Sequence, residues 1–90
     1  MSEHNRQYFN YTHSSASLWA RVMLSTGINN MAALDMLKVF AKRDFPSIDP
    51  SEMQVVHYKS GKVGIEFVVS RLYDTIPDQY EKVDQFPESY

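Results

Sequence analysis

The sequence contains no cysteine, and this absence excludes a disulfide framework, a thiolate metal site and a cysteine nucleophile. Its hydrophobic runs are short, because none approaches the roughly 20 residues of a membrane span. The first six residues carry no apolar stretch resembling a signal peptide. We therefore expect a cytoplasmic protein with neither disulfides nor a membrane anchor.

Glycine and histidine are also scarce, with three copies of each. The glycines do not form a phosphate-cradling loop, because Gly61 belongs to a turn and Gly27 precedes a helix alone. The histidines, His4, His13 and His57, show no pair at a spacing that would converge on one metal ion. We expect no metal, no cofactor and no enzymatic activity.

What is present indicates one small folded domain. The 90 residues are 43% hydrophobic and 13% aromatic, which are the fractions of a folded protein and not of a disordered one. The net charge of −2 is unevenly spread. Eight Lys and Arg face six Asp and Glu through Tyr73, whereas one faces five from Asp74 onward, so the acidity belongs to the C-terminal tail.

The firmest expected element is a helix from Met31 to Arg43, a stretch without glycine or proline that Asn29 or Asn30 can cap. Helical periodicity places an apolar stripe on one side and charged residues on the other. The stripe comprises Ala33, Met36, Leu37 and Phe40, flanked by Leu34 and Ala41. The opposite side carries Asp35, Lys38 and Lys42. After the helix, Asp49 with Glu52 is expected to form a single capped helical turn.

A β-hairpin is expected next, with strands at 53–59 and 62–69 joined by Ser60-Gly61. A two-residue turn pairs Lys59 with Lys62 and sets the register of the whole hairpin. On the face toward the helix, Tyr58 lies opposite Val63, Val56 opposite Ile65, and Gln54 opposite Phe67. On the exposed face, His57 lies opposite Gly64 and Val55 opposite Glu66. Phe40 is then expected to contact Val56, Ile65 or Phe67.

Two segments precede the helix. Residues 1–15 are either a frayed arm or an edge strand, with β-forming residues from Gln7 to Thr12. Ser17 to Ser25 alternates, with Leu18, Ala20, Val22 and Leu24 on one side, and is better interpreted as a strand than as a helix. The resulting β-α-β-β order, with the strand containing Trp19 beside strand 62–69, predicts an α+β fold. This fold is a small antiparallel sheet with one main helix on one face, a partial ferredoxin-like layout.

The chain accordingly divides into an N-terminal arm or edge strand (1–15), a single α+β domain (16–73) and an acidic aromatic tail (74–90). Thr75 with Pro77 could start a short helix in the tail. Apolar residues recur there at spacings of three or four, as in an amphipathic segment that docks on a groove. They are Tyr73, Ile76, Tyr80, Val83, Phe86 and Tyr90, among the acids Asp78, Glu81 and Asp84. The groove is either the protein's own or that of a partner.

These features favour a non-enzymatic protein–protein interaction module, an adaptor or small inhibitor of the kind encoded as a host or phage accessory protein. Its expected partner-binding residues are those of the tail, together with His57, Glu66, Lys59 and Lys62 on the exposed sheet face. Gly64 beside His57 would leave space above the backbone for a His57–Glu66 pair. The alternative is a nucleic-acid-binding domain of RNA-recognition topology, although Gly64 and Glu66 stand where base-stacking aromatics are needed. Homo-oligomerisation stays open.

Overall fold

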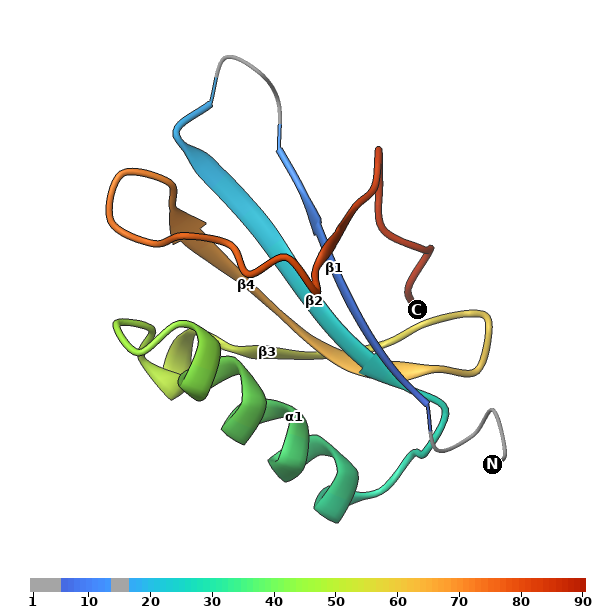
Figure 1. Cartoon of the computed structure of the whole chain (residues 1–90). Coiled ribbons are helices and arrows are strands. Elements are labelled where there is room, and N and C mark those ends of the chain that lie inside the picture. Colours follow the sequence, from blue (N-terminus) through green and yellow to red (C-terminus); the bar gives the residue numbers. More distant parts are fainter. Residues whose placement is uncertain (1–5, 14–16) are drawn as a thin grey trace.

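A computed structural model describes residues 6–13 and 17–90. Five strands form one sheet in the order β3-β4-β2-β1-β5, and the helix α1 packs on one of its faces (Figure 1). The elements in chain order are β1 (Gln7–Thr12), β2 (Trp19–Thr26), α1 (Met31–Asp44), the 3-10 helix η2 (Pro50–Glu52), β3 (Gln54–His57), β4 (Val63–Ser70) and β5 (Glu81–Lys82). The predicted α+β class, with one main helix on a small sheet, is confirmed.

The two capped elements follow their local sequence signals. Asn30 caps α1, because its side-chain oxygen accepts from the Ala33 amide at 2.8 Å. Asp49 caps η2 by accepting from the Ser51 amide at 2.9 Å. That same backbone hydrogen bond lowers the pKa of the exposed Asp49 carboxyl from its ordinary value. Both predicted caps are confirmed, and α1 ends one residue later than expected.

The buried face of α1 is rotated from the predicted stripe. Leu37 is fully buried, with Ala33, Leu34 and Ala41 around it, whereas Met36 and Phe40 lie at the margin. Phe40 packs at the edge of the core, with its ring 6.3 Å from that of Phe9 on β1 and the Arg43 guanidinium 4.9 Å from its centre. The apolar stripe is therefore centred on Leu37. Phe40 lies at its margin, where its ring faces Phe9 of β1.

The centre of the sheet is antiparallel, as predicted. β2 pairs with β4 from Trp19 opposite Ser70 to Thr26 opposite Val63. On its other side β2 pairs with β1, so Gln7–Thr12 forms a strand, although β5 and not β1 stands at this edge of the sheet. The strand next to β2 on this side is thus the N-terminal one, which precedes the β-α-β-β unit in the chain. The short β5 then joins β1 in parallel.

The register predicted for the hairpin is wrong by one residue. The Tyr58 amide donates to the Lys62 carbonyl at 2.9 Å, and the Gly61 amide donates to the Tyr58 carbonyl at 3.0 Å. The loop therefore has three residues, and Gly61 adopts a φ of 96°, which a three-residue hairpin with a glycine bulge requires. His57 consequently pairs with Val63, and not with Gly64.

A shift of one residue exchanges the two faces of a strand. Val55 and His57 now lie on the helix side of the sheet, while Val56 and Tyr58 lie on the outer face, away from α1. The expected contact between Phe40 and Val56 is thereby excluded. β3 lies at the edge of the sheet, so Val55 and His57 are exposed even though they point to the helix side.

The segment that follows β4 wraps around the sheet. Residues 71–80 cross the helix side, β5 runs along β1, and residues 83–90 return over the outer face toward the hairpin (Figure 1). The short helix expected after Thr75 does not form in the described residues, which have a turn closed by the Tyr80 amide and the Pro77 carbonyl at 3.0 Å. β1 and β5 thus belong to the same sheet as β2, β3 and β4.

Candidate functional site

The predicted partner-binding residues of the tail do not share one surface. Tyr80 is only 4% exposed and Ile76 packs against the core, whereas Tyr73 and Tyr90 are 86% and 88% exposed. Val83 and Phe86 are half-buried. The acids Asp78, Glu81 and Asp84 are exposed. The regular apolar spacing of the tail therefore reflects two different packing sites within this chain, and the tail presents no continuous apolar face outward.

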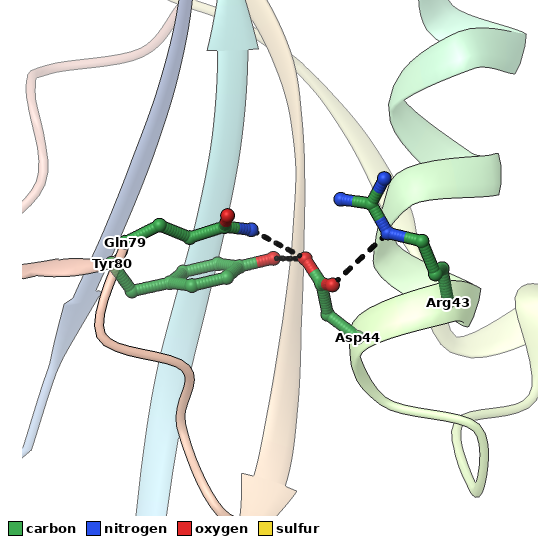
Figure 2. A network of polar contacts seen from close by, with 4 residues as sticks. All are labelled: Arg43, Asp44, Gln79 and Tyr80. Atoms are coloured by element: carbon green, nitrogen blue, oxygen red, sulfur yellow. Dashed lines mark hydrogen bonds and ion pairs between the residues drawn. The ribbon is translucent and has the colours of Figure 1, made fainter.

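The first half of the tail is fixed to the end of α1 by Tyr80. The Tyr80 ring lies between Phe9 and Phe45, with ring centres 5.3 and 5.5 Å away, each in an edge-to-face arrangement. Its hydroxyl donates to Asp44 Oδ2 at 2.9 Å, where the Gln79 amide also donates at 2.9 Å (Figure 2). Arg43 Nε contacts the other oxygen of Asp44 at 3.2 Å. The Asp44 carboxylate thus accepts hydrogen bonds from Gln79 and Tyr80 of the tail and from Arg43 of the helix.

The second half of the tail lies on the outer face of the sheet. The Arg21 guanidinium sits 4.8 Å from the centre of the Phe86 ring. The end of the chain pairs with the hairpin, because the Lys59 amide donates to the Glu88 carbonyl at 2.9 Å and the Tyr90 amide donates to the His57 carbonyl at 3.0 Å. A side-chain contact of 3.5 Å between Lys59 and Glu88 adds to this pairing. The outer face is therefore partly covered by residues 83–90.

The His57–Glu66 pair expected from the sequence is not formed. Glu66 pairs with Gln54 and lies on the outer face, whereas His57 lies on the helix side. Glu66 accepts two other hydrogen bonds instead. The Arg21 guanidinium donates to Oε1 at 2.7 Å, and the Tyr58 hydroxyl donates to Oε2 at 3.0 Å. The physical reason is the hairpin register, since a one-residue shift moved His57 to the other face of the sheet.

The two buried phenols act as hydrogen-bond donors and not as bases. Burial raises the pKa of Tyr58 far above its ordinary value, and the neighbouring Glu66 charge raises it further. Burial also raises the pKa of Tyr80 far above its ordinary value, and the hydrogen bond to Asp44 raises it further. Both hydroxyls therefore stay protonated at physiological pH and hold their carboxylate partners.

Replacement of His57 by Ala is expected to change the free energy of unfolding by less than about 1 kcal/mol, as for exposed positions generally. The His57 side chain is exposed on the edge strand β3, and its contact with the tail uses only its backbone carbonyl. Urea denaturation of the two proteins measures the difference. A loss above about 2 kcal/mol would show that His57 contributes to the core.

Sequence reasoning missed a group of exposed apolar side chains near the end of the sheet where β2 begins and β4 ends. The Arg71 amide donates to the Leu18 carbonyl at 2.7 Å and brings the two chain segments together. Trp19 is 60% exposed, and four other apolar side chains in these segments are also exposed. We call this group the terminal patch; it comprises Leu18, Trp19, Val68, Leu72 and Tyr73.

The terminal patch gave only a weak signal in the sequence. Leu18 was expected on one side of the strand with Ala20, Val22 and Leu24, but β2 begins at Trp19 and the Leu18 side chain is exposed. Leu72 and Tyr73 follow β4 in a turn, in which the Tyr73 and Asp74 amides donate to the Ser70 carbonyl at 3.2 and 2.9 Å. The alternation of Trp19 with Arg21 was visible, but only the pairing of β2 with β4 gathers these residues.

Other kinds of site find little support in the part of the chain that the structure describes. No group of three or more His, Cys, Asp or Glu residues there is placed to hold a metal ion. None of the described helices is both long enough and apolar enough to cross a membrane. Comparisons of the chain with protein-family models, curated proteins and solved structures found no match.

Proposed function

We propose that this chain is a non-enzymatic, cytoplasmic protein–protein interaction module, an adaptor or small inhibitor, that binds its partner through the terminal patch. The observation that carries the proposal is the exposure of Leu18, Trp19, Leu72 and Tyr73 together at one end of the sheet. Several exposed apolar side chains near one another on the surface of a small domain are typical of interaction sites. The tail, by contrast, is engaged with the protein's own sheet.

The composition and rigidity of the patch support this proposal. Trp, Tyr and Arg are the residues that most often dominate binding energy at protein interfaces, and Trp19, Tyr73 and Arg71 occur together here. The backbone hydrogen bond between Arg71 and Leu18 holds the two segments in place before binding. A pre-ordered surface loses less conformational entropy when a partner docks.

The charges around the patch indicate the chemistry of the partner. Arg21, opposite Val68 on the outer face, and Arg71, beside Leu18, are both exposed cations. The Glu66 carboxylate forms an ion pair with Arg21 and also accepts a hydrogen bond from the Tyr58 hydroxyl. We infer a partner with an apolar pocket whose rim carries carboxylates, since such a rim would complement the two arginines.

A nucleic-acid partner has less support. RNA-recognition domains stack bases on aromatic side chains of an open sheet face. Here the central positions of that face are Gly64 and Glu66, and residues 83–90 lie over part of it. The net charge of −2 also opposes binding to a polyanion.

The proposal is tested by partner capture from the source cells with three baits, quantified by mass spectrometry. The baits are the wild type, a Trp19→Ser/Leu72→Ser variant, and Val39→Ser as a matched control. Val39 is an exposed apolar residue on α1, outside the patch. We expect a protein that wild type and Val39→Ser enrich equally and that the patch variant loses by about tenfold or more, as for truncated interface anchors.

Binding of that protein to the purified baits should then show the same order of affinities. Equal capture by the patch variant and the control would place the interface elsewhere. Micromolar binding to random oligonucleotides that is lost in the patch variant would make nucleic-acid binding the better account.

A further inference from the structure

A cleft of about 400 Å³ lies between the outer face of the sheet and the C-terminal segment, at the opposite end of β2 from the terminal patch. This volume is within the usual range of small-molecule sites, roughly 300–1,000 Å³. The register brings Tyr8 opposite Ser25 and Asn10 opposite Met23, so these four residues form the floor. Tyr58 and Lys62 flank the cleft, and residues 83 and 85–87 form its roof.

The floor contains an unpartnered polar atom. Ser25 is 1% exposed, and among the described residues its hydroxyl oxygen is the buried side-chain atom without a hydrogen-bond partner. Burial of an unpaired hydroxyl destabilises a fold, and alanine would fill the same backbone position without that penalty. Ser25 lines the cleft, so a ligand in the cleft could supply the missing partner.

The cleft also contains a cation above an aromatic ring. Lys62 Nζ lies 3.8 Å from the centre of the Tyr8 ring, and it forms no ion pair with any carboxylate of residues 6–13 and 17–90. Tyr8, Met23 and Phe86 provide flat or polarizable surfaces on the floor and the roof. An ammonium group and two aromatic rings in the lining of one cleft favour a planar ligand that bears an anionic group.

We propose that this cleft binds a small planar aromatic carboxylate. The ring of the ligand packs against Phe86, its carboxylate contacts Lys62 Nζ above the Tyr8 ring, and the Ser25 hydroxyl donates to a ligand oxygen. The Ser25 oxygen is buried in the free protein, so a side chain that lines the cleft must move slightly for the ligand to reach it.

The probe for this proposal is 2-naphthoate, titrated into the full chain and followed by amide chemical shifts in two-dimensional NMR. We expect saturable shifts centred on Ser25, Lys62 and Phe86, with a Kd of about 1 mM or tighter, as for a ligand of this size. Naphthalene-2-methanol, which has a similar shape but no charge, should bind about tenfold more weakly.

Two variants separate this site from non-specific binding. Lys62→Met keeps an apolar stem but removes the charge, and should weaken 2-naphthoate about tenfold, whereas Lys38→Met on α1 should leave the affinity unchanged. Ser25→Ala should weaken the ligand about fivefold while leaving the melting temperature of the free protein equal or higher, because it removes an unpaired hydroxyl.

The proposal is overturned if no saturable shift occurs up to about 10 mM 2-naphthoate, or if Lys62→Met and Lys38→Met bind alike. Shifts centred on Trp19 and Leu72 would instead assign the probe to the terminal patch. A fall in the melting temperature of Ser25→Ala would show that the hydroxyl already has a partner in the free protein. None of these results affects the proposed protein interaction, which uses the other end of the sheet.

Discussion

Replacement of Tyr80 by Ala is expected to lower the free energy of unfolding by about 3–5 kcal/mol, the usual cost of truncating a buried aromatic side chain. The change removes a ring that lies between Phe9 and Phe45, together with the hydroxyl that donates to Asp44. The total stability of a domain of this size is only about 5 kcal/mol or slightly more. The variant should therefore be close to unfolded at physiological temperature.

The matched control is Tyr90→Ala, which makes the same change in the same segment at a residue that is 88% exposed. Its effect should stay within about 0.5 kcal/mol. Tyr80→Phe isolates the hydrogen bond to Asp44 and should cost about 1 kcal/mol. Urea denaturation of the three variants gives the comparison. Similar small losses for Tyr80→Ala and Tyr90→Ala would show that the tail is not part of the core.

The Tyr80 result also bears on function. If Tyr80 is required for folding, the first half of the tail cannot leave the domain to dock on a partner without exposing Phe9 and Phe45. Binding through a surface that is already exposed, such as the terminal patch, then becomes the less costly route. A stable Tyr80→Ala protein that loses its partner would reverse this argument and return the interface to the tail.

Replacement of Gly64 by Ala is expected to destabilise the protein by about 3 kcal/mol, at the upper end of the range for overpacked cores. A Cβ atom at this position would lie 2.4 Å from the Leu24 carbonyl oxygen and 3.0 Å from Ser25 Cβ. The Leu24 oxygen belongs to the backbone of β2 in the middle of the sheet, so it cannot move aside as a flexible side chain would. The sequence-based expectation that Gly64 leaves open space above the backbone is therefore wrong.

Gly61→Ala in the same hairpin is the control for the loss of a glycine as such. A Cβ at Gly61 meets no atom within 4 Å, and the cost comes only from its φ of 96°. That cost should be about 1 kcal/mol. Thermal melts of both variants test the difference. An effect of Gly61→Ala equal to that of Gly64→Ala would mean that the close approach of β4 to β2 is relieved by a shift of the strands.

Local signals in the sequence determined most of the secondary structure. The α1 helix has a cap at Asn30 and no internal breaker, and η2 has its cap at Asp49, so each depends on residues within one or two turns of itself. The alternation of residues 17–25 predicted β2, and its place beside β4 was expected from the partial ferredoxin-like layout. These features gave the α+β class correctly.

Tertiary structure decided which side chains lie on which face of the sheet. The Ser60-Gly61 sequence fits a turn of two or three residues, and the choice between them places His57 and Glu66 on the same face or on opposite ones. The spacing of Ile76, Tyr80 and Phe86 identified an apolar segment, but it could not show that this segment wraps both faces of its own sheet. The terminal patch and the cleft at Ser25 each combine residues from β2 with residues more than thirty positions away. Local sequence patterns carry no information about which distant segments will meet, because those contacts are chosen by the packing of the whole chain.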